Sequence, residues 1–93
     1  MGFFEKRRIQ KEIAELEVEQ RWLKQRRADL QPAYFEGLNA FRQWAESVKR
    51  NRPDHDAMMR TVPKNPTHDE YTQICSRLAD VEMKIEELKS KLA

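Results

Sequence analysis

The chain has 93 residues, of which 37% are charged and 39% hydrophobic, and its formal net charge is +2. A chain this short forms at most one domain and buries only about 60 to 65% of the surface that its unfolded form exposes. This net charge is too small to indicate a polyanionic partner. No apolar run reaches the ~20 residues of a membrane-spanning helix. The single cysteine, Cys75, excludes an internal disulfide. We therefore expect a cytoplasmic protein with no membrane partner.

The pattern of residues predicts an all-α protein with one helical domain over residues 1–93. The chain has only two glycines and four prolines, and no alternating run of β-branched residues predicts a strand. The charge is unevenly distributed: residues 1–52 carry 12 Lys and Arg against 8 Asp and Glu, whereas residues 53–93 carry 6 against 8. This asymmetry is compatible with a nucleic-acid partner or with packing of one half on the other.

The first helix is predicted over residues 4–30. Its apolar side chains recur every three or four residues and so share one face; they are Ile9, Ile13, Leu16, Leu23 and Leu30. Lys6, Gln20 and Arg27 stand on the same face, and polar residues in such positions tend to select the register and the partner. We expect this face to pack selectively on another helix.

Val18 and Trp22 lie four residues apart, away from that face. A large apolar side chain such as tryptophan is not expected on a helix face that contacts only solvent. Trp and Arg are residue types that often anchor interfaces. Two interpretations stay open. Together with Arg26, these residues form a docking patch for another protein, or Trp22 packs within the chain beneath Phe35 or Trp44.

A second, aromatic-rich helix is predicted over residues 32–50. Pro32 disfavours helical geometry at the residue before it, but the apolar spacing runs on from Leu30 to Tyr34 without a slip. This favours a kinked continuation of the first helix over a separate one. The predicted packing face contains Tyr34, Leu38, Phe41, Ala45 and Val48. Five of the eight aromatic residues lie between residues 34 and 71, so we expect the densest part of the core here.

Residues 51–66 hold three of the four prolines and are predicted to form a loop, with room for one helical turn at residues 54–59. The last helix, residues 67–92, has the clearest pattern. Thr67 and Glu70 match a capping box at its start. Its apolar face repeats over about three heptads, which is typical of a coiled coil: Tyr71, Ile74, Leu78, Val81, Ile85, Leu88 and Leu92.

Chemically reactive sites are not predicted. His55, His68 and Cys75 are metal-ligand types, but His68 and Cys75 stand two helical turns apart, too far to share an ion without a third ligand between them. Cys75 is expected to be a small, half-buried apolar residue rather than a nucleophile. We expect no metal, cofactor, small-molecule substrate or enzymatic activity.

Basic residues are the main alternative source of function. Candidate nucleic-acid contacts are Arg7, Arg8, Arg26 and Arg27. Phosphate binding requires such charges to gather on one face, whereas a helical projection spreads them around the first helix among glutamates. The projection favours a solvated helix with internal ion pairs over a nucleic-acid surface.

Together these patterns predict an antiparallel helical hairpin or coiled coil with an aromatic middle helix. The residues expected to bind a helix partner are Ile9, Ile13, Leu16, Leu23, Tyr71, Ile74, Leu78, Val81, Ile85 and Leu88. The apolar surface exceeds what one hairpin covers, which predicts a homodimer or a permanent complex. The leading hypothesis is a non-enzymatic protein–protein interaction module, an adaptor or a small inhibitor. The alternative is a nucleic-acid-binding regulator.

Overall fold

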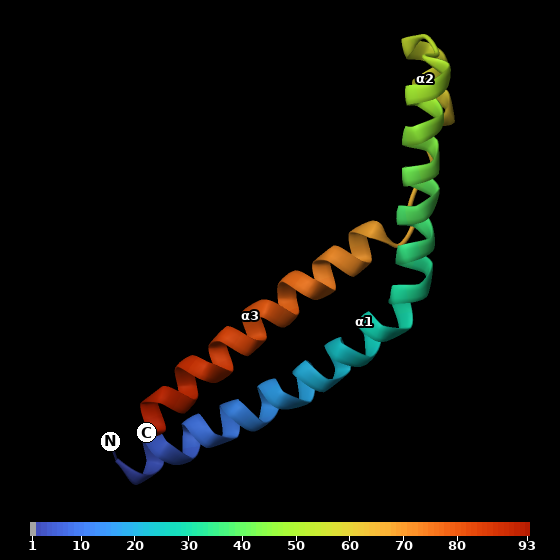
Figure 1. Cartoon of the computed structure of the whole chain (residues 1–93). Helices are drawn as coiled ribbons and strands as arrows, with labels where there is room; N and C mark the ends of the chain where they lie inside the picture. Colours follow the sequence, from blue (N-terminus) through green and yellow to red (C-terminus); the bar gives the residue numbers. More distant parts are fainter. Residues whose placement is uncertain (1) are drawn as a thin grey trace.

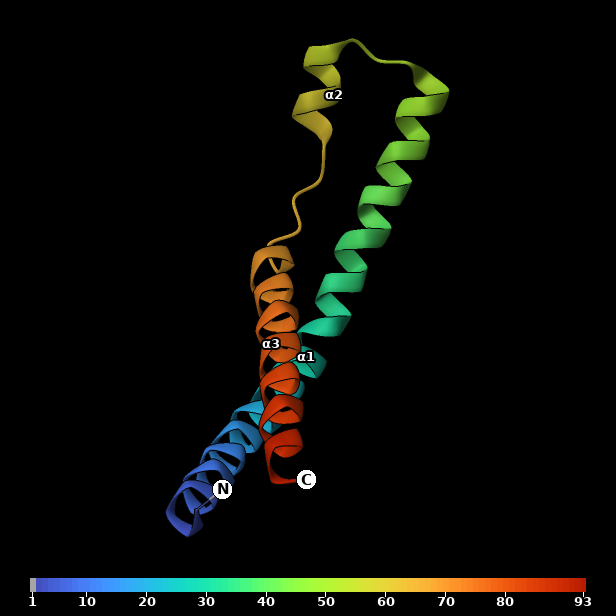
Figure 2. The ribbon, with the colours of Figure 1, turned by 90° about the vertical axis from the view of Figure 1, so that its left-hand side faces the viewer.

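A computed structural model describes residues 2–93. They form three helices in the order α1 (Phe3–Asn51), α2 (His55–Thr61) and α3 (His68–Leu92). The first half of α1 and the whole of α3 lie side by side as a helical hairpin, with both chain ends at the same end of the molecule (Figures 1 and 2). Residues 2–93 contain no strand. The all-α prediction and the hairpin prediction are therefore confirmed. Within these residues, no helix combines the length and the apolar character needed to cross a membrane.

The core is a single strip of aliphatic side chains between α1 and α3. Because these residues recur every three or four positions, each helix turns a narrow apolar face toward the other. Leu78 and Val81, in the middle of α3, are only 1% exposed. The remaining buried members are Ile9, Ile13, Leu23, Leu30, Ile74, Ile85 and Leu88, with Leu16, Tyr71 and Leu92 packed at the edges.

α1 runs without interruption through Pro32. The helix bends where the colour turns to teal, so that its second half points away from the hairpin (Figure 1). Proline explains the bend, because its ring removes a backbone donor and crowds the preceding turn. Of the two alternatives left open by the sequence, the structure has the kinked continuation. The helix ends at Arg52, whose backbone is left-handed (φ 46°) and whose N–H donates to the Val48 carbonyl at 2.9 Å.

The start of α3 is packed against this bend by aromatic rings. The rings of Tyr34 and Tyr71 are stacked at a centroid distance of 4.0 Å. His68 lies near the same Tyr34 ring, with a centroid distance of 6.1 Å. The Gln31 amide donates to the Tyr71 hydroxyl at 3.4 Å. The bend thus fixes where the second arm of the hairpin begins.

The predicted capping box at the start of α3 is wrong. Thr67 is the residue before the helix, but its backbone is helical rather than extended and its side chain caps nothing. Instead its N–H and its hydroxyl both donate to the Asn65 side-chain oxygen, at 3.2 and 2.7 Å. Glu70 is drawn away to an ion pair with Arg26. Local sequence matched a capping box, but contacts with α1 determined the geometry.

Asn65 also ties the returning chain to α1. Its amide nitrogen donates to the Tyr34 carbonyl at 3.2 Å, and its side chain lies directly against the Cα of Gly37. A side chain at position 37 would overlap it. Glycine is therefore required here by close approach of the chain, and Asn65 joins the bend of α1 to the first turn of α3.

The segment predicted to be a loop contains the short helix α2. Asp54 caps this helix, because its carboxylate accepts the Ala57 N–H at 2.8 Å. The Trp44 indole N–H donates to the Thr61 hydroxyl at 3.0 Å, which fastens α2 to the second half of α1. Beyond the start of α3, which packs on Tyr34, this segment is the cover that the structure of residues 2–93 provides for that half.

The second half of α1 is not the densest part of the core, contrary to expectation. Tyr34 and Val48 are half-buried, but Leu38, Phe41 and Ala45 on the same predicted face are exposed. The reason is the size of the segment that packs there. The short helix α2 and the non-helical residues on either side of it bury less of α1 than a long helix such as α3 does. Phe35 and Phe41 therefore lie on the surface, whereas Tyr34 and Trp44 are half-buried.

The molecule is long and thin. Its radius of gyration is 20.9 Å and its principal extents are 68 × 21 × 17 Å, whereas a compact domain of this length has a radius of about 12 Å. The accessible surface is 7429 Å², against about 5,700 Å² expected for a compact monomer of this mass. The chain exposes far more surface than a typical monomeric domain.

Candidate interaction surfaces

The residues predicted to bind a helix partner face one another inside the hairpin. Those of α1 pack on those of α3, and only Leu16 and Tyr71 remain half-exposed at the edges. Gln20 and Arg27, the polar residues on the same face of α1, are half-buried. Their stems can lie along the apolar strip while their polar ends reach its margin. Within this chain, each apolar face thus has the other as its partner.

Two ion pairs flank the hairpin. Arg77 of α3 binds Glu19 of α1 through two hydrogen bonds of 2.8 and 2.7 Å. Arg26 of α1 binds Glu70 of α3 at 2.7 Å. Both pairs are solvent-accessible and each contributes modestly to stability. Their main effect is to select the antiparallel alignment, since only one register brings both arginines to their carboxylates.

The Glu19 pair makes stability depend on pH. The hydrogen bonds from Arg77, helped by its positive charge and opposed by slight desolvation, lower the pKa of Glu19 below its ordinary value of 4.5. The pKa of Arg77 is raised, so this side chain stays charged throughout. A carboxyl whose folded pKa is depressed adds stability above its unfolded pKa, and this is lost as the pH falls through the folded pKa.

We therefore expect Glu19→Gln to lower the free energy of unfolding at neutral pH and to make its decline in acid shallower. Urea unfolding at neutral pH and at about pH 3 measures both effects. Glu15→Gln is the matched control, because Glu15 is exposed and has no ion pair within residues 2–93. The same acid dependence in both variants would contradict the assignment.

The tryptophan patch, Val18 and Trp22, is uncovered. Trp22 is 62% exposed and Val18 58% exposed. The intrachain interpretation, in which Trp22 packs beneath Phe35 or Trp44, is wrong, because the bend at Pro32 carries the second half of α1 away from it. Arg26, one turn beyond Trp22, is held in place by Glu70. The patch is thus a large aromatic side chain beside a fixed guanidinium.

The four arginines considered for nucleic-acid binding do not form one surface. Arg7 lies over the Phe3 ring, with 5.9 Å between the guanidinium carbon and the ring centroid, near the start of α1. Arg26 and Arg27 lie some 19 residues further along the helix, which is roughly 28 Å. Arg26 is engaged by Glu70, and Arg27 is half-buried. Only Arg7 and Arg8 are near neighbours on an exposed part of the chain.

A further apolar surface lies on the second half of α1, where the sequence predicted dense core. Phe35 and Phe41 are each 50% exposed and Leu38 is 39% exposed. We name these three residues the aromatic strip. They follow one another at intervals of three on the second half of α1, beside the face that meets the returning segment. The signal was present in the apolar spacing, but the sequence pattern alone did not show that this face lacks an intrachain partner.

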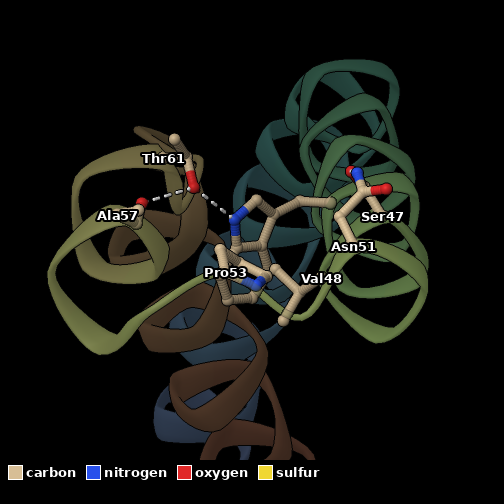
Figure 3. A pocket seen from close by; sticks show the side chains of 7 residues that line it. Ser47, Val48, Asn51, Pro53, Ala57 and Thr61 are labelled. Atoms are coloured by element: carbon tan, nitrogen blue, oxygen red, sulfur yellow. Dashed lines mark hydrogen bonds between the residues drawn. The ribbon is translucent and has the colours of Figure 1, made fainter.

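A shallow hollow lies between α2 and the end of α1, lined by Trp44, Ser47, Val48, Asn51, Pro53, Ala57 and Thr61. The Trp44 indole N–H donates to the Thr61 hydroxyl across it, and within α2 the same hydroxyl donates to the Ala57 carbonyl (Figure 3). Its volume of about 230 Å³ is below the roughly 300–1,000 Å³ of typical small-molecule sites. The hollow is best described as the incomplete packing of α2 on α1.

Within residues 2–93, no three side chains of the His, Cys, Asp and Glu types gather as a metal site would require. Cys75 is half-buried beside the core, in agreement with the small apolar role expected for it. Comparison with known proteins gave no match to a family model, to a curated protein or to a solved structure. Function must therefore be argued from the surfaces themselves.

Proposed function

We propose that this protein is a non-enzymatic protein–protein interaction module, an adaptor or small inhibitor, that binds a partner protein through the tryptophan patch on α1. The observation that carries the proposal is the exposure of Trp22 on a helix that the hairpin holds in place. Tryptophan and arginine dominate the binding energy of protein interfaces. Trp22 has such an arginine, Arg26, fixed one helical turn away.

The hairpin supports this role by reducing the cost of binding. A partner that docks on α1 meets a backbone already ordered by packing on α3, so little conformational entropy is lost. The elongated shape adds reach, since it presents helix surface along an extent of 68 Å. We also propose that the chain forms a homodimer, because its exposed surface exceeds that of a compact monomer.

The test compares the binding proteins recovered by the tagged 93-residue chain with those recovered by its Trp22→Ala variant. We expect Trp22→Ala to recover at least about tenfold less of the partner protein, because truncation of an anchor residue weakens binding by that much or more. Met83→Ala is the matched control, because Met83 is also an exposed apolar residue, 70% accessible, but lies on α3. Equal recovery by all three proteins would overturn the proposal.

Salt separates this function from nucleic-acid regulation. Binding through the tryptophan patch should change little between about 0.05 and 0.2 M salt, whereas phosphate binding weakens steeply over that range. Replacing Arg7 and Arg8 by Gln should leave partner recovery intact. Loss of binding in that variant, together with a steep salt dependence and sensitivity to nuclease, would favour the nucleic-acid alternative.

A further inference from the structure

The aromatic strip is symmetric about its central residue. Phe35 precedes Leu38 by three positions, and Phe41 follows it by three. Tyr34 lies four positions before Leu38 and Arg42 four after, so the symmetry of residue types is confined to the strip itself. On a helix of 3.6 residues per turn these five positions share one side. The order of residue types in the strip is the same in both directions: an aromatic ring, leucine and an aromatic ring.

No other segment of residues 2–93 covers the strip. The returning chain is bound to a neighbouring part of α1, where Asn65 lies against Gly37 and the indole of Trp44 bonds to Thr61. The apolar residues of α3 are already buried against the first half of α1. A cover for the strip must therefore come from another molecule.

The exposed surface is large enough for such a cover. The chain exposes 7429 Å², which is roughly 1,700 Å² more than the size relation for compact monomers gives. A stable dimer of ordinary size needs about 800 Å² from each partner. The excess belongs to the whole elongated molecule and is about twice what one such interface takes from each chain.

We propose that a second copy of this chain covers the aromatic strip, with the two α1 helices antiparallel about a two-fold axis at Leu38. In a two-fold interface, residue i meets residue j and residue j meets residue i. Leu38 then meets Leu38, and Phe35 of each copy meets Phe41 of the other. This inference names the contact through which the homodimer of the proposed function forms, and it does not involve the tryptophan patch.

The charges are compatible with self-pairing. In the same register Arg42 of one copy faces Tyr34 of the other, an uncharged residue whose ring is already stacked on Tyr71, so the flanks bring no like charges together. Arg27 and Lys49 would also face each other if α1 were straight. Because α1 bends at Pro32, the paired region is confined to about residues 31–45 and this repulsion is avoided. The net charge of +2 per chain opposes association only weakly.

Light scattering over a concentration series tests the proposal. We expect the chain to show twice its mass of 11.2 kDa, and Leu38→Glu to show the mass of one chain, because the two new carboxylates would meet at the axis. Circular dichroism should show Leu38→Glu fully helical, since Leu38 is partly exposed. Met83→Glu is the control and should remain dimeric. A wild-type monomer at every concentration, or a dimer that survives Leu38→Glu, would overturn the inference.

Disulfide cross-linking tests the antiparallel register in a Cys75→Ser background. Leu38→Cys should cross-link to itself on oxidation. Phe35→Cys mixed with Phe41→Cys should cross-link as a mixed pair, but neither should do so alone. Identical residues at position 35 would be offset by about 9 Å along the helices, beyond the ~7 Å reach of a disulfide. Self-cross-linking at positions 35 and 41 without the mixed pair would overturn the register.

Failure of this inference is distinguishable from failure of the proposed partner binding. Trp22→Ala should remain dimeric while it loses the partner protein, because the tryptophan patch is outside the paired region. Leu38→Glu should become monomeric while it still recovers that partner. If Trp22→Ala also became monomeric, the dimer contact would lie at the tryptophan patch, and the assignment to the aromatic strip would be wrong.

Discussion

Leu78→Ala is expected to lower the free energy of unfolding by about 2–5 kcal/mol, the largest effect of any single truncation proposed for this chain. Leu78 is almost completely buried at the centre of α3, against the apolar face of α1. Truncation removes apolar contacts and leaves a cavity that two long helices cannot easily close. A domain of this size has a total stability of roughly 5–14 kcal/mol, so the variant should lose a large part of it. The urea concentration at the unfolding midpoint measures this loss.

Two conditions make this measurement decisive. Protein concentration must be fixed, because dimer formation adds to apparent stability by mass action. Met83→Ala, on the solvent side of α3, serves as the reference and should change stability by no more than about 0.5 kcal/mol. If the two variants were equally stable, the packing of α3 on α1 described above would be wrong.

Gly37→Ala is expected to destabilise the chain by about 1–2 kcal/mol, although alanine is the better helix former by about 1 kcal/mol. The new methyl group would overlap the Asn65 side chain, which bonds to the Tyr34 carbonyl and to Thr67. Removing Asn65 should reverse the sign. In an Asn65→Ala background, Gly37→Ala no longer meets an obstacle and should stabilise by its helix propensity alone.

A double-mutant cycle measures this reversal directly. The four proteins are wild type, the two single variants and the double variant, each unfolded in urea under the same conditions. The expected interaction energy is about 2–3 kcal/mol, because a steric penalty is exchanged for a propensity gain. Additive effects would show that Asn65 does not lie against Gly37 in solution.

The hairpin could be predicted because its information is periodic. In α3 every apolar position from Ile74 to Leu88 that the spacing assigned to one face is buried. In α1 the same face also contains Gln20 and Arg27, which are half-buried. Spacing of this kind identifies which residues share a face. The apolar face of α3 packs on that of the first half of α1, within the same chain.

The remaining features depend on long-range contacts that periodicity does not encode. Phe35, Leu38 and Phe41 belong to an apolar face, but whether that face is covered depends on how the segment after Asn51 returns. The start of α3 matched a local capping pattern at Thr67, yet the Thr67 N–H and hydroxyl bond to the side chain of Asn65, which also bonds to α1. Predictions from local sequence patterns were wrong where contacts between distant segments determined the hydrogen bonding or the burial.

The position of the chain ends has a consequence for folding kinetics. Both ends lie at the same end of the hairpin (Figure 1), so the interface joins residues separated by most of the chain. Folding rates fall as the mean sequence separation of native contacts rises. This protein should therefore fold more slowly than helical bundles joined by tight turns. Between the aromatic rings of α1 and α3, the contact of shortest separation joins Tyr34 to His68 at the bend, so the two arms should align outward from there.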